Sequence, residues 1–131
     1  MFLGVKLECA QCHNHPFAKW KRQQFWEYAA FFSEVSQPPF DPNNPRQMRT
    51  AYTPGEIAIP GTDKVARAKF PDGKEATFSG RNARAALAEW VTAKDNPYFA
   101  RAAVNRVWEY LLGTGIVEPV DEESTENPAS H

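Results

Sequence analysis

The sequence predicts a mainly α-helical protein with a small β-hairpin and a proline-rich connector. Three stretches of the 131-residue chain carry apolar residues at helical spacing, and a fourth holds six of the 11 prolines. A fifth contains a turn signal between two runs that favour strands. Because 42% of the residues are hydrophobic and 13% are aromatic, the composition indicates a folded core and excludes an intrinsically disordered chain.

The first helix is expected over residues 17–35, where apolar side chains recur at positions i, i+3, i+4 and i+7 and form one stripe. The members of this stripe are Phe25, Tyr28, Ala29 and Phe32. Trp26 and Phe31 lie beside the stripe and widen the apolar face. The helix is expected to end before Pro38 and Pro39, because proline disfavours helical geometry in the preceding residue and cannot continue a helix.

A connector without regular structure is expected over residues 37–62, because prolines interrupt it repeatedly. Beyond it, the sequence Pro71-Asp72-Gly73-Lys74 places proline and glycine where a β-turn favours them. Runs that favour strands flank this turn at residues 65–70 and 76–79. We therefore expect a small hairpin built from these two runs.

Two further helices are expected in the last third of the chain. The first covers residues 81–94, and its expected apolar face is Ala83, Leu87, Trp90 and Val91. Asn96-Pro97 combines a favoured capping residue with a favoured first helical residue, so the second is expected to run from there to about residue 112. Its expected buried side chains are Phe99, Ala103, Val107 or Arg106, and Tyr110. Gly113 and Gly115 are the expected C-terminal caps.

The charge balance and the cysteine count restrict the class of protein. Fifteen Lys and Arg against sixteen Asp and Glu give a formal net charge of −1, which argues against a nucleic-acid binder held by bulk phosphate neutralisation. No apolar run approaches the ~20 residues of a membrane-spanning helix. Two cysteines cannot form a disulfide-dense scaffold. No secretory signal precedes Cys9 and no closing element follows the last helix, so both ends are expected to be cuts through a longer protein.

Cys9-Ala10-Gln11-Cys12-His13 is a Cys-x-x-Cys-His pentapeptide, the pattern typical of covalent c-type haem attachment. Two thiols three positions apart on a short helical turn can each bond to one haem vinyl group, and the adjacent histidine can then ligate the iron. The pentapeptide predicts haem c with Cys9 and Cys12 as thioether positions and His13 as the proximal ligand. The expected elements around it do not make a complete standard cytochrome c fold.

Other interpretations of the cysteines stay open. Cys9 and Cys12 could hold zinc together with histidines, of which the chain has His13, His15 and His131. The two thiols could instead be structural. A thiol redox centre is a further interpretation, but the βαβ context that such a motif prefers is missing.

The second axial ligand of an iron at His13 has three candidates. Met48 lies in the proline-rich connector and His131 at the C-terminal end, and Lys19 is a more remote third. An ordinary apolar anchor is the competing interpretation of Met48. His15 is only two residues beyond His13 and cannot readily reach the opposite face of the iron, so we expect a structural or supporting role for it.

No catalytic constellation is identified, because a Gly-rich phosphate loop, a nucleophile elbow and a His-Glu-x-x-His motif are all missing from the sequence. Arg101, Asn105 and Arg106 on the last helix could form a polar binding or hydrolytic site. A salt-bridged helix surface explains the same residues. Whether the chain is an enzyme is left open.

Two long stretches of the chain resemble known families. Phe2-Leu3-Gly4-Val5, followed by Cys9-Ala10-Gln11-Cys12-His13-Asn14-His15-Pro16-Phe17 and Lys19-Trp20, resembles the planctomycete cytochrome-associated domain of unknown function. Five later stretches resemble the start of the companion domain of that family: Leu87-Ala88-Glu89-Trp90, Asp95-Asn96-Pro97, Phe99-Ala100-Arg101, Val104-Asn105-Arg106-Val107-Trp108 and Gly115-Ile116-Val117-Glu118-Pro119-Val120-Asp121. Asn127-Pro128-Ala129-Ser130-His131 matches a further companion motif.

The resemblance implies that residues 1–48 are the end of the first family's domain, 49–80 a connector with the hairpin, and 81–131 the start of the companion domain. It also implies an extracytoplasmic, multidomain parent protein, often with a separate cytochrome-like domain. One departure from the family is that Asn14 and Ala18 stand where it usually has Asp, so an orienting carboxylate for the histidines is missing.

Together these observations predict a haem-binding electron-transfer module whose partners are the other domains of the parent protein and a redox partner. No nucleic-acid partner and no membrane span are expected. The alternative is a non-haem structural or zinc-binding module of a secreted polymer-degrading or scaffolding protein.

Overall fold

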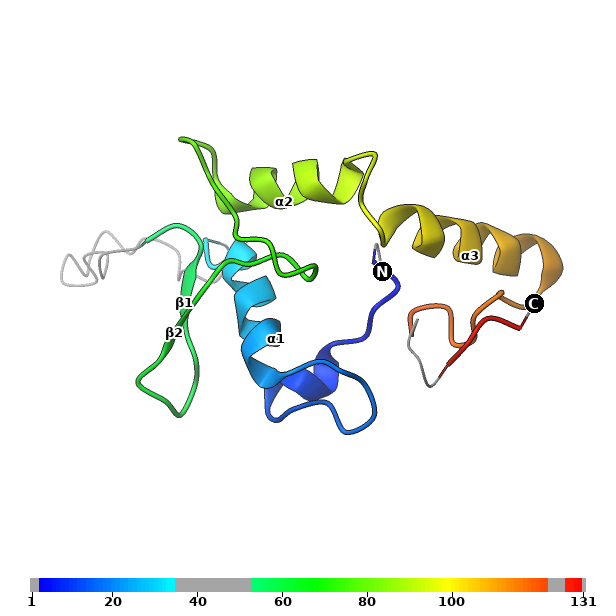
Figure 1. Cartoon of the computed structure of the whole chain (residues 1–131), viewed down its shortest axis with the longest axis horizontal. Helices are drawn as coiled ribbons and strands as arrows, with labels where there is room; N and C mark the ends of the chain where they lie inside the picture. Colours follow the sequence, from blue (N-terminus) through cyan, green and yellow to red (C-terminus); the bar gives the residue numbers. More distant parts are fainter. Residues whose placement is uncertain (1–2, 35–52, 123–126, 131) are drawn as a thin grey trace, which may run out of the picture. The chain divides into compact units, whose positions relative to one another are not determined.

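The computed structural model describes residues 3–34, 53–122 and 127–130 (Figure 1). Its contacts divide the chain into two compact units, which are described separately. The first unit combines Met1–Phe25 with Ala88–His131, and the second is Trp26–Leu87. Three α-helices and one two-stranded antiparallel sheet make the protein mainly helical, which confirms the fold class that the sequence predicts.

The first helical elements are a 3-10 helix η1 (Glu8–Gln11), the α-helix α1 (Arg22–Ala29) and a 3-10 helix η2 (Ala30–Phe32). Helix α1 is therefore shorter than the helix expected over residues 17–35. The backbone N–H groups of Phe17 and Ala18 are taken up by the His15 ring, so the chain forms a loop where the helix was expected to begin. The helix begins at Arg22, so residues 19–21 precede it. The Lys21 carbonyl accepts its first N–H groups, those of Gln24 at 3.0 Å and Phe25 at 3.3 Å.

The core of the second unit is centred on Phe31, the largest fully buried side chain among the described residues. Its ring stacks on Phe70 with centroids 5.0 Å apart, and Tyr28 meets it edge-on at 6.2 Å. Phe32, expected in the buried stripe, is exposed. The helix changes from 3.6 to 3.0 residues per turn at η2, which rotates the following side chains away from the α-helical stripe. This change explains why Phe32 is exposed although its spacing predicts burial.

The observed hairpin pairs β1 (Glu56–Ala58) with β2 (Val65–Arg67), with Ile57 opposite Ala66. β1 lies beside η2 in the second unit (Figure 1). The prediction of a small hairpin is confirmed, but its strands differ from those expected. β2 is the start of the expected strand 65–70, and its partner comes from the stretch expected to be an irregular connector.

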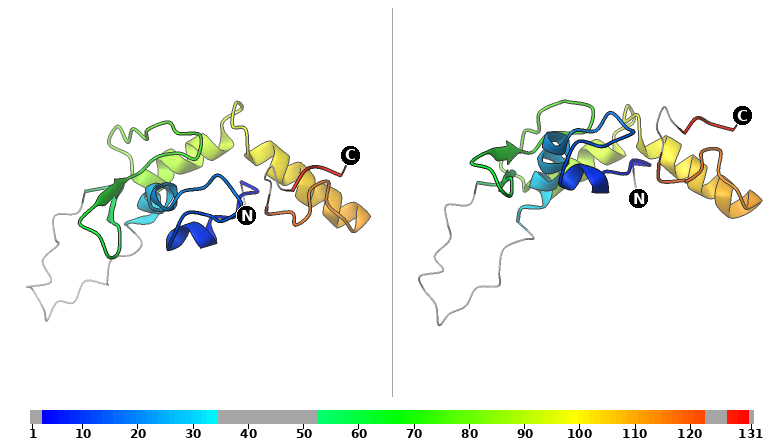
Figure 2. Two further views of the ribbon diagram at one scale, coloured as in Figure 1. Left: turned by 60° about the horizontal axis from the view of Figure 1, so that its bottom comes forward. Right: turned by 90° about the horizontal axis from the view of Figure 1, so that it is seen from below.

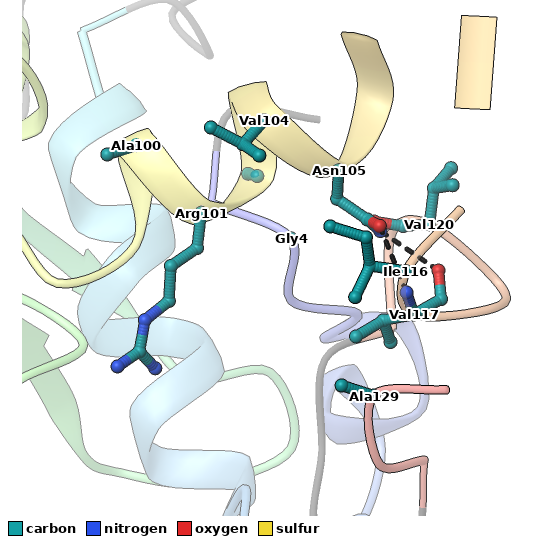
Figure 3. A pocket seen from close by; sticks show the side chains of 10 residues that line it. Gly4, Ala100, Arg101, Val104, Asn105, Ile116, Val117, Val120 and Ala129 are labelled. Carbon is teal, nitrogen blue, oxygen red and sulfur yellow. Dashed lines mark hydrogen bonds between the residues drawn. The ribbon is translucent and has the colours of Figure 1, made fainter. Parts of the chain in front are cut away.

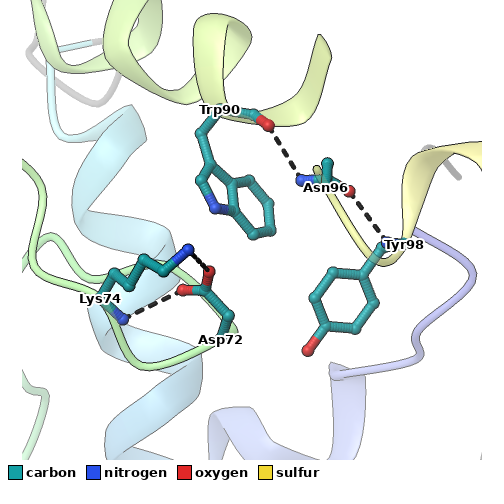
Figure 4. A network of polar contacts seen from close by, with 5 residues as sticks. All are labelled: Asp72, Lys74, Trp90, Asn96 and Tyr98. Carbon is teal, nitrogen blue, oxygen red and sulfur yellow. Dashed lines mark hydrogen bonds and ion pairs between the residues drawn. The ribbon is translucent and has the colours of Figure 1, made fainter. Parts of the chain in front are cut away.

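The turn expected at residues 71–74 does form, without a strand after it. Gly73 N–H donates to Phe70 O at 2.9 Å, and Asp72 holds Lys74 through an ion pair of 3.3 Å and a backbone hydrogen bond of 3.0 Å (Figure 4). Residues 76–79 were expected to be the second strand and are not one. An isolated antiparallel bridge joins Lys69 to Glu75 across the turn, and the Ala76 N–H donates to Ala68 O at 3.4 Å, so the two expected runs pair only beside the turn. The ring of Phe78 lies against Gly55, where an added Cβ would come within 2.4 Å of it.

Helix α2 (Ala83–Thr92) lies within the helix expected over residues 81–94. Asn82 caps it, because its Oδ1 accepts the Ala85 N–H at 2.7 Å. Ala83 and Leu87 are buried as expected, together with Ala86, whereas Trp90 and Val91 are half-buried.

Helix α3 (Phe99–Leu112) follows a turn organised by Asn96 (Figure 4). The Asn96 Oδ1 accepts the N–H groups of Tyr98 and Phe99, each at 2.9 Å, and its Nδ2 donates to Trp90 O at 2.9 Å. The expected capping role of Asn96 is confirmed, with the helix beginning at Phe99. Gly113 ends the helix in the left-handed region at φ 82°, as expected of a C-terminal cap.

The buried face of α3 differs from the expected one. Ala102 and Asn105 are buried, whereas four residues expected to be buried are exposed: Phe99, Ala103, Val107 and Tyr110. The chain after Gly113 folds back along the helix in Figures 1 and 2, and it bonds to Asn105. The returning chain therefore covers the side of α3 that carries the polar residue Asn105. No helix within the described residues combines the length and the apolar character that crossing a membrane requires.

Candidate functional site

The pentapeptide lies on η1, where the short helical turn expected for it is present. Cys9 and Cys12 are both exposed, and both are free thiols. Ala10, between them, is buried, and its N–H donates to Leu7 O at 2.9 Å. The turn is therefore anchored through Ala10 and presents its two sulfur atoms to solvent.

One ring nitrogen of His13 forms a hydrogen bond, and this leaves only the other ring nitrogen with a free lone pair. His13 Nδ1 lies 2.7 Å from the backbone oxygen of Asn14. A carbonyl oxygen only accepts hydrogen bonds, so Nδ1 carries the proton of the neutral imidazole and Nε2 keeps a lone pair. The exposed His13 thus has the tautomer found in histidines that ligate a metal through Nε2, in which the other ring nitrogen donates to a carbonyl.

His15 has the opposite arrangement. Its Nδ1 accepts the backbone N–H groups of Phe17, at 3.2 Å, and Ala18, at 2.9 Å. Its own backbone N–H donates to Trp20 O at 2.8 Å, and Trp20 is buried. In the neutral ring the proton therefore lies on Nε2, and the lone pair of Nδ1 is already in use. The geometry makes His15 a residue that closes the loop between η1 and α1.

Asn14 and Arg22 connect the pentapeptide to helix α1. The Asn14 side-chain oxygen accepts the Arg22 N–H at 3.0 Å, at the first residue of the helix. The Arg22 side chain returns a longer hydrogen bond, Nε to Gln11 O at 3.4 Å. Asn14 holds His13 through its main-chain oxygen, so this contact does not depend on the carboxylate that the family usually has at position 14.

The other predicted ligands are not gathered at this turn. Met48 and His131 lie outside the described residues. Lys19 Nζ lies 5.8 Å from the centroid of the Trp20 ring, a cation–π contact on the loop. Where the structure describes the chain, no group of three or more His, Cys, Asp or Glu side chains is placed to hold a metal ion.

Of the three polar residues of α3, Arg101 and Asn105 line one pocket, whereas Arg106 is not among its lining residues (Figure 3). Asn105 is buried and bonds twice to one residue of the returning chain, Nδ2 to Val117 O at 2.9 Å and Oδ1 to Val117 N–H at 3.0 Å (Figure 3). Arg106 forms an ion pair with Asp121. The sequence analysis did not foresee that Asn105 binds backbone, because Val117 comes 12 residues later and only the folded turn brings the two together.

A pocket of about 360 Å³ lies in the first unit, beside Asn105 (Figure 3). Its lining is mostly apolar, with Val104 from α3 and Ile116, Val117 and Val120 from the returning chain. Gly115 permits this approach, because a Cβ added there would come within 2.7 Å of Val117 O and 2.8 Å of Val120 Cγ1. This glycine, expected to be a helix cap, is required for close packing.

Two family comparisons match the two ends of the chain. Residues 1–37 match PSCyt2, described as a protein of unknown function (DUF1549), and residues 83–131 match PSD1, described as a protein of unknown function (DUF1553). Each match covers less than half of the chain, so the chain is similar to one family at its start and to the other at its end. Both are planctomycete cytochrome-associated domain families, so the resemblance found in the sequence is confirmed. No curated protein and no solved structure matches the chain.

The PSCyt2 segment contains the whole pentapeptide and the loop that holds it, whereas the PSD1 segment contains α2, α3 and the returning chain. Cys9, Cys12 and His13 therefore lie within the stretch that matches PSCyt2. Neither family description assigns it a reaction.

Proposed function

We propose that the PSCyt2 segment is a c-type haem attachment module that serves electron transfer. The observation that carries this proposal is the His13–Asn14 hydrogen bond next to two exposed free thiols. It leaves the Nε2 lone pair of His13 available on the same short turn as Cys9 and Cys12. A covalent haem requires this donor set, two reduced thiols and one neutral imidazole nitrogen.

Each residue of the pentapeptide then has a defined task. Cys9 and Cys12 would hold a haem by adding their S–H groups across its vinyl groups, with sulfur on one carbon and hydrogen on the other, which would require reduced thiols and no oxidant. His13 would ligate the iron through Nε2, with its ring oriented by the hydrogen bond to the Asn14 carbonyl. The bound haem would supply a one-electron redox couple whose potential its axial ligands and surroundings set.

The loop around the pentapeptide supports this function by limiting motion. Asn14, His15 and Arg22 bind backbone groups between residues 11 and 22, so the turn is tied to the beginning of α1 at several points. A ligand held in this way loses less conformational freedom when it binds a metal, which favours binding. We further propose that the parent protein works outside the cytoplasm and transfers electrons to a redox partner, with Met48 and His131 as the candidates for the second axial position.

Expression of the 131-residue chain in a host with c-type cytochrome maturation tests the proposal. The expected result is a pyridine haemochrome spectrum that persists after acid–acetone extraction, because thioether bonds resist it. Cys9→Ala and Cys12→Ala should each remove one attachment point, and the double variant should lose all retained haem. Ser33→Ala, at a hydroxyl away from the turn, is the control that should keep it.

Wild-type chain without a haemochrome signal would end the proposal. Metal analysis of protein made without haem maturation then decides between the remaining interpretations. Stoichiometric zinc that the Cys9→Ala variant loses would indicate a zinc site, and a metal-free folded protein would indicate structural cysteines.

A further inference from the structure

Arg22 returns a positive charge to the pentapeptide. It is the first residue of α1, and it is half-buried. Its side-chain Nε donates to the backbone oxygen of Gln11 at 3.4 Å, and Gln11 lies between the two cysteines. Its backbone N–H donates separately to the side-chain oxygen of Asn14 at 3.0 Å. The main chain of Arg22 therefore fastens the loop, and its guanidinium lies against the turn that carries both thiols.

The start of a helix is an unfavourable place for a cation. The first turn is the positive end of the helix dipole, where acidic side chains are stabilising and basic ones are not. Helix α1 has no acidic residue in its first turn, and its first residue is Arg22. The charge of Arg22 therefore does not stabilise the helix that carries it, and it adds to the positive potential at the helix start.

The chain around the pentapeptide has charge of the same sign. Between Glu8 and Glu27 it holds three basic residues and neither Asp nor Glu. Lys19 Nζ lies 5.8 Å from the centroid of an aromatic ring on the loop, and Lys21 is exposed. Among the contacts of the described residues, Arg22 is the one of the three basic residues whose side chain bonds to the pentapeptide.

We propose that the Arg22 guanidinium raises the reduction potential of a haem attached at this turn, an inference that rests on the proposed function. A haem iron has one positive charge fewer in its reduced state, so a nearby fixed cation favours that state. A guanidinium keeps its charge at every working pH. Arg22 would thus act through its charge, without touching the iron, and would favour uptake of an electron from the redox partner.

Redox titration of the haem-loaded chain against a fixed mediator at low salt tests the proposal. Arg22→Gln should shift the equilibrium toward oxidised haem by about threefold or more, because it removes one elementary charge. Arg22→Lys keeps the charge and should stay close to wild type. Added salt should reduce the difference between wild type and Arg22→Gln, because it screens a half-buried charge in part. All variants keep the hydrogen bond to Asn14, which uses the backbone N–H.

Lys21→Gln is the matched control. It removes the same charge one residue earlier, from a side chain that does not bond to the pentapeptide. Its shift should be clearly smaller than that of Arg22→Gln. Equal shifts in the two variants would overturn the proposal, because the effect would then belong to the net charge of the loop. An Arg22→Lys variant as easily oxidised as Arg22→Gln would overturn it as well, because geometry and not charge would then matter.

The haem-free chain separates this role from a structural one. The midpoint of denaturation and the neutral tautomer of His13, read by nitrogen-15 NMR, should be the same in wild type and Arg22→Gln, since backbone groups hold the loop and the ring. A lower midpoint or a changed tautomer would assign Arg22 a structural role and overturn the proposal. A chain that attaches no haem ends the proposed function and this inference together, whereas a haem-loaded Arg22→Gln with an unchanged potential ends this inference alone.

Discussion

At the scale of single residues, the two histidines next to the cysteines are distinguished by their hydrogen-bond partners. A carbonyl faces Nδ1 of His13, and backbone N–H groups face Nδ1 of His15. The sequence places both residues in one motif and indicates which could ligate an iron. It cannot give the tautomers, because these depend on which backbone groups the folded loop brings to each ring.

The first prediction concerns these tautomers. In nitrogen-15 NMR spectra recorded at a pH where both imidazoles are neutral, His13 should show its proton on Nδ1 and His15 on Nε2. The measurement needs no haem, so it tests the loop geometry separately from the proposed function. The reverse assignment for His13 would remove the observation on which haem ligation rests.

A second residue-scale prediction concerns Tyr28. Burial raises the pKa of its hydroxyl above the ordinary value of 10.0. The unfolded chain then loses this proton at a lower pH than the folded protein, so the free energy of unfolding is unaffected below pH 10 and falls as the pH rises toward the folded-state pKa. Denaturant unfolding of wild-type chain and Tyr28→Phe at pH 8 and above pH 10 measures this. The loss of stability with pH should be smaller in Tyr28→Phe, and equal losses would contradict the assignment.

At the scale of elements, periodicity predicts where helices form better than which face they bury. All three α-helices lie within or close to expected stretches because their apolar spacing is local. The buried face predicted for α3 was wrong because the returning chain covers the side that carries Asn105. The predicted partner strand of the hairpin was wrong because residues 56–58 pair with β2 across a loop that holds proline and glycine. The contact at Asn105 joins residues 12 positions apart, and the strands pair across a six-residue loop, so neither follows from the spacing of apolar residues within one element.

The turn at Asn96 gives a prediction for helix α3. Asn96→Ala should lower the free energy of unfolding by about 1–2 kcal/mol, because it removes the cap and leaves the Trp90 carbonyl without its hydrogen bond. Asn82→Ala, which removes one capping bond of α2, should cost less, about 1 kcal/mol. Chemical denaturation followed by circular dichroism compares the two variants. If Asn96→Ala lowered the free energy of unfolding no more than Asn82→Ala, this would contradict the role of Asn96 as both a cap of α3 and a donor to the Trp90 carbonyl.

The hairpin gives a matched pair of glycine substitutions. Gly55 and Gly61 both have positive φ, 76° and 73°, but only at Gly55 would a Cβ meet a side chain, Phe78 at 2.4 Å. Gly61→Ala should cost about 1–2 kcal/mol from the backbone conformation alone. Gly55→Ala should cost about 1–3 kcal/mol more, because Phe78 must move. Equal midpoints of denaturation would show that Phe78 does not pack on Gly55.

At the scale of the whole molecule, the two ends of the chain are similar to two different families, and both matched stretches contribute to the first compact unit. The residues between the two matches, 38–82, make up most of the second unit where the structure describes it. The sequence motifs were enough to recognise both families, because they are long and specific. The domain division at residues 48 and 80 stays a prediction.

The central claim at this scale is that the PSCyt2 segment carries covalent haem. Intact-mass spectrometry of chain purified from a maturation-competent host, followed by peptide mapping, tests it most directly. We expect a mass increase of one haem per chain, with both attachment points in the peptide that contains Cys9 and Cys12. An unmodified mass, with both cysteines recovered as free thiols from a host that matures a control cytochrome, would contradict it.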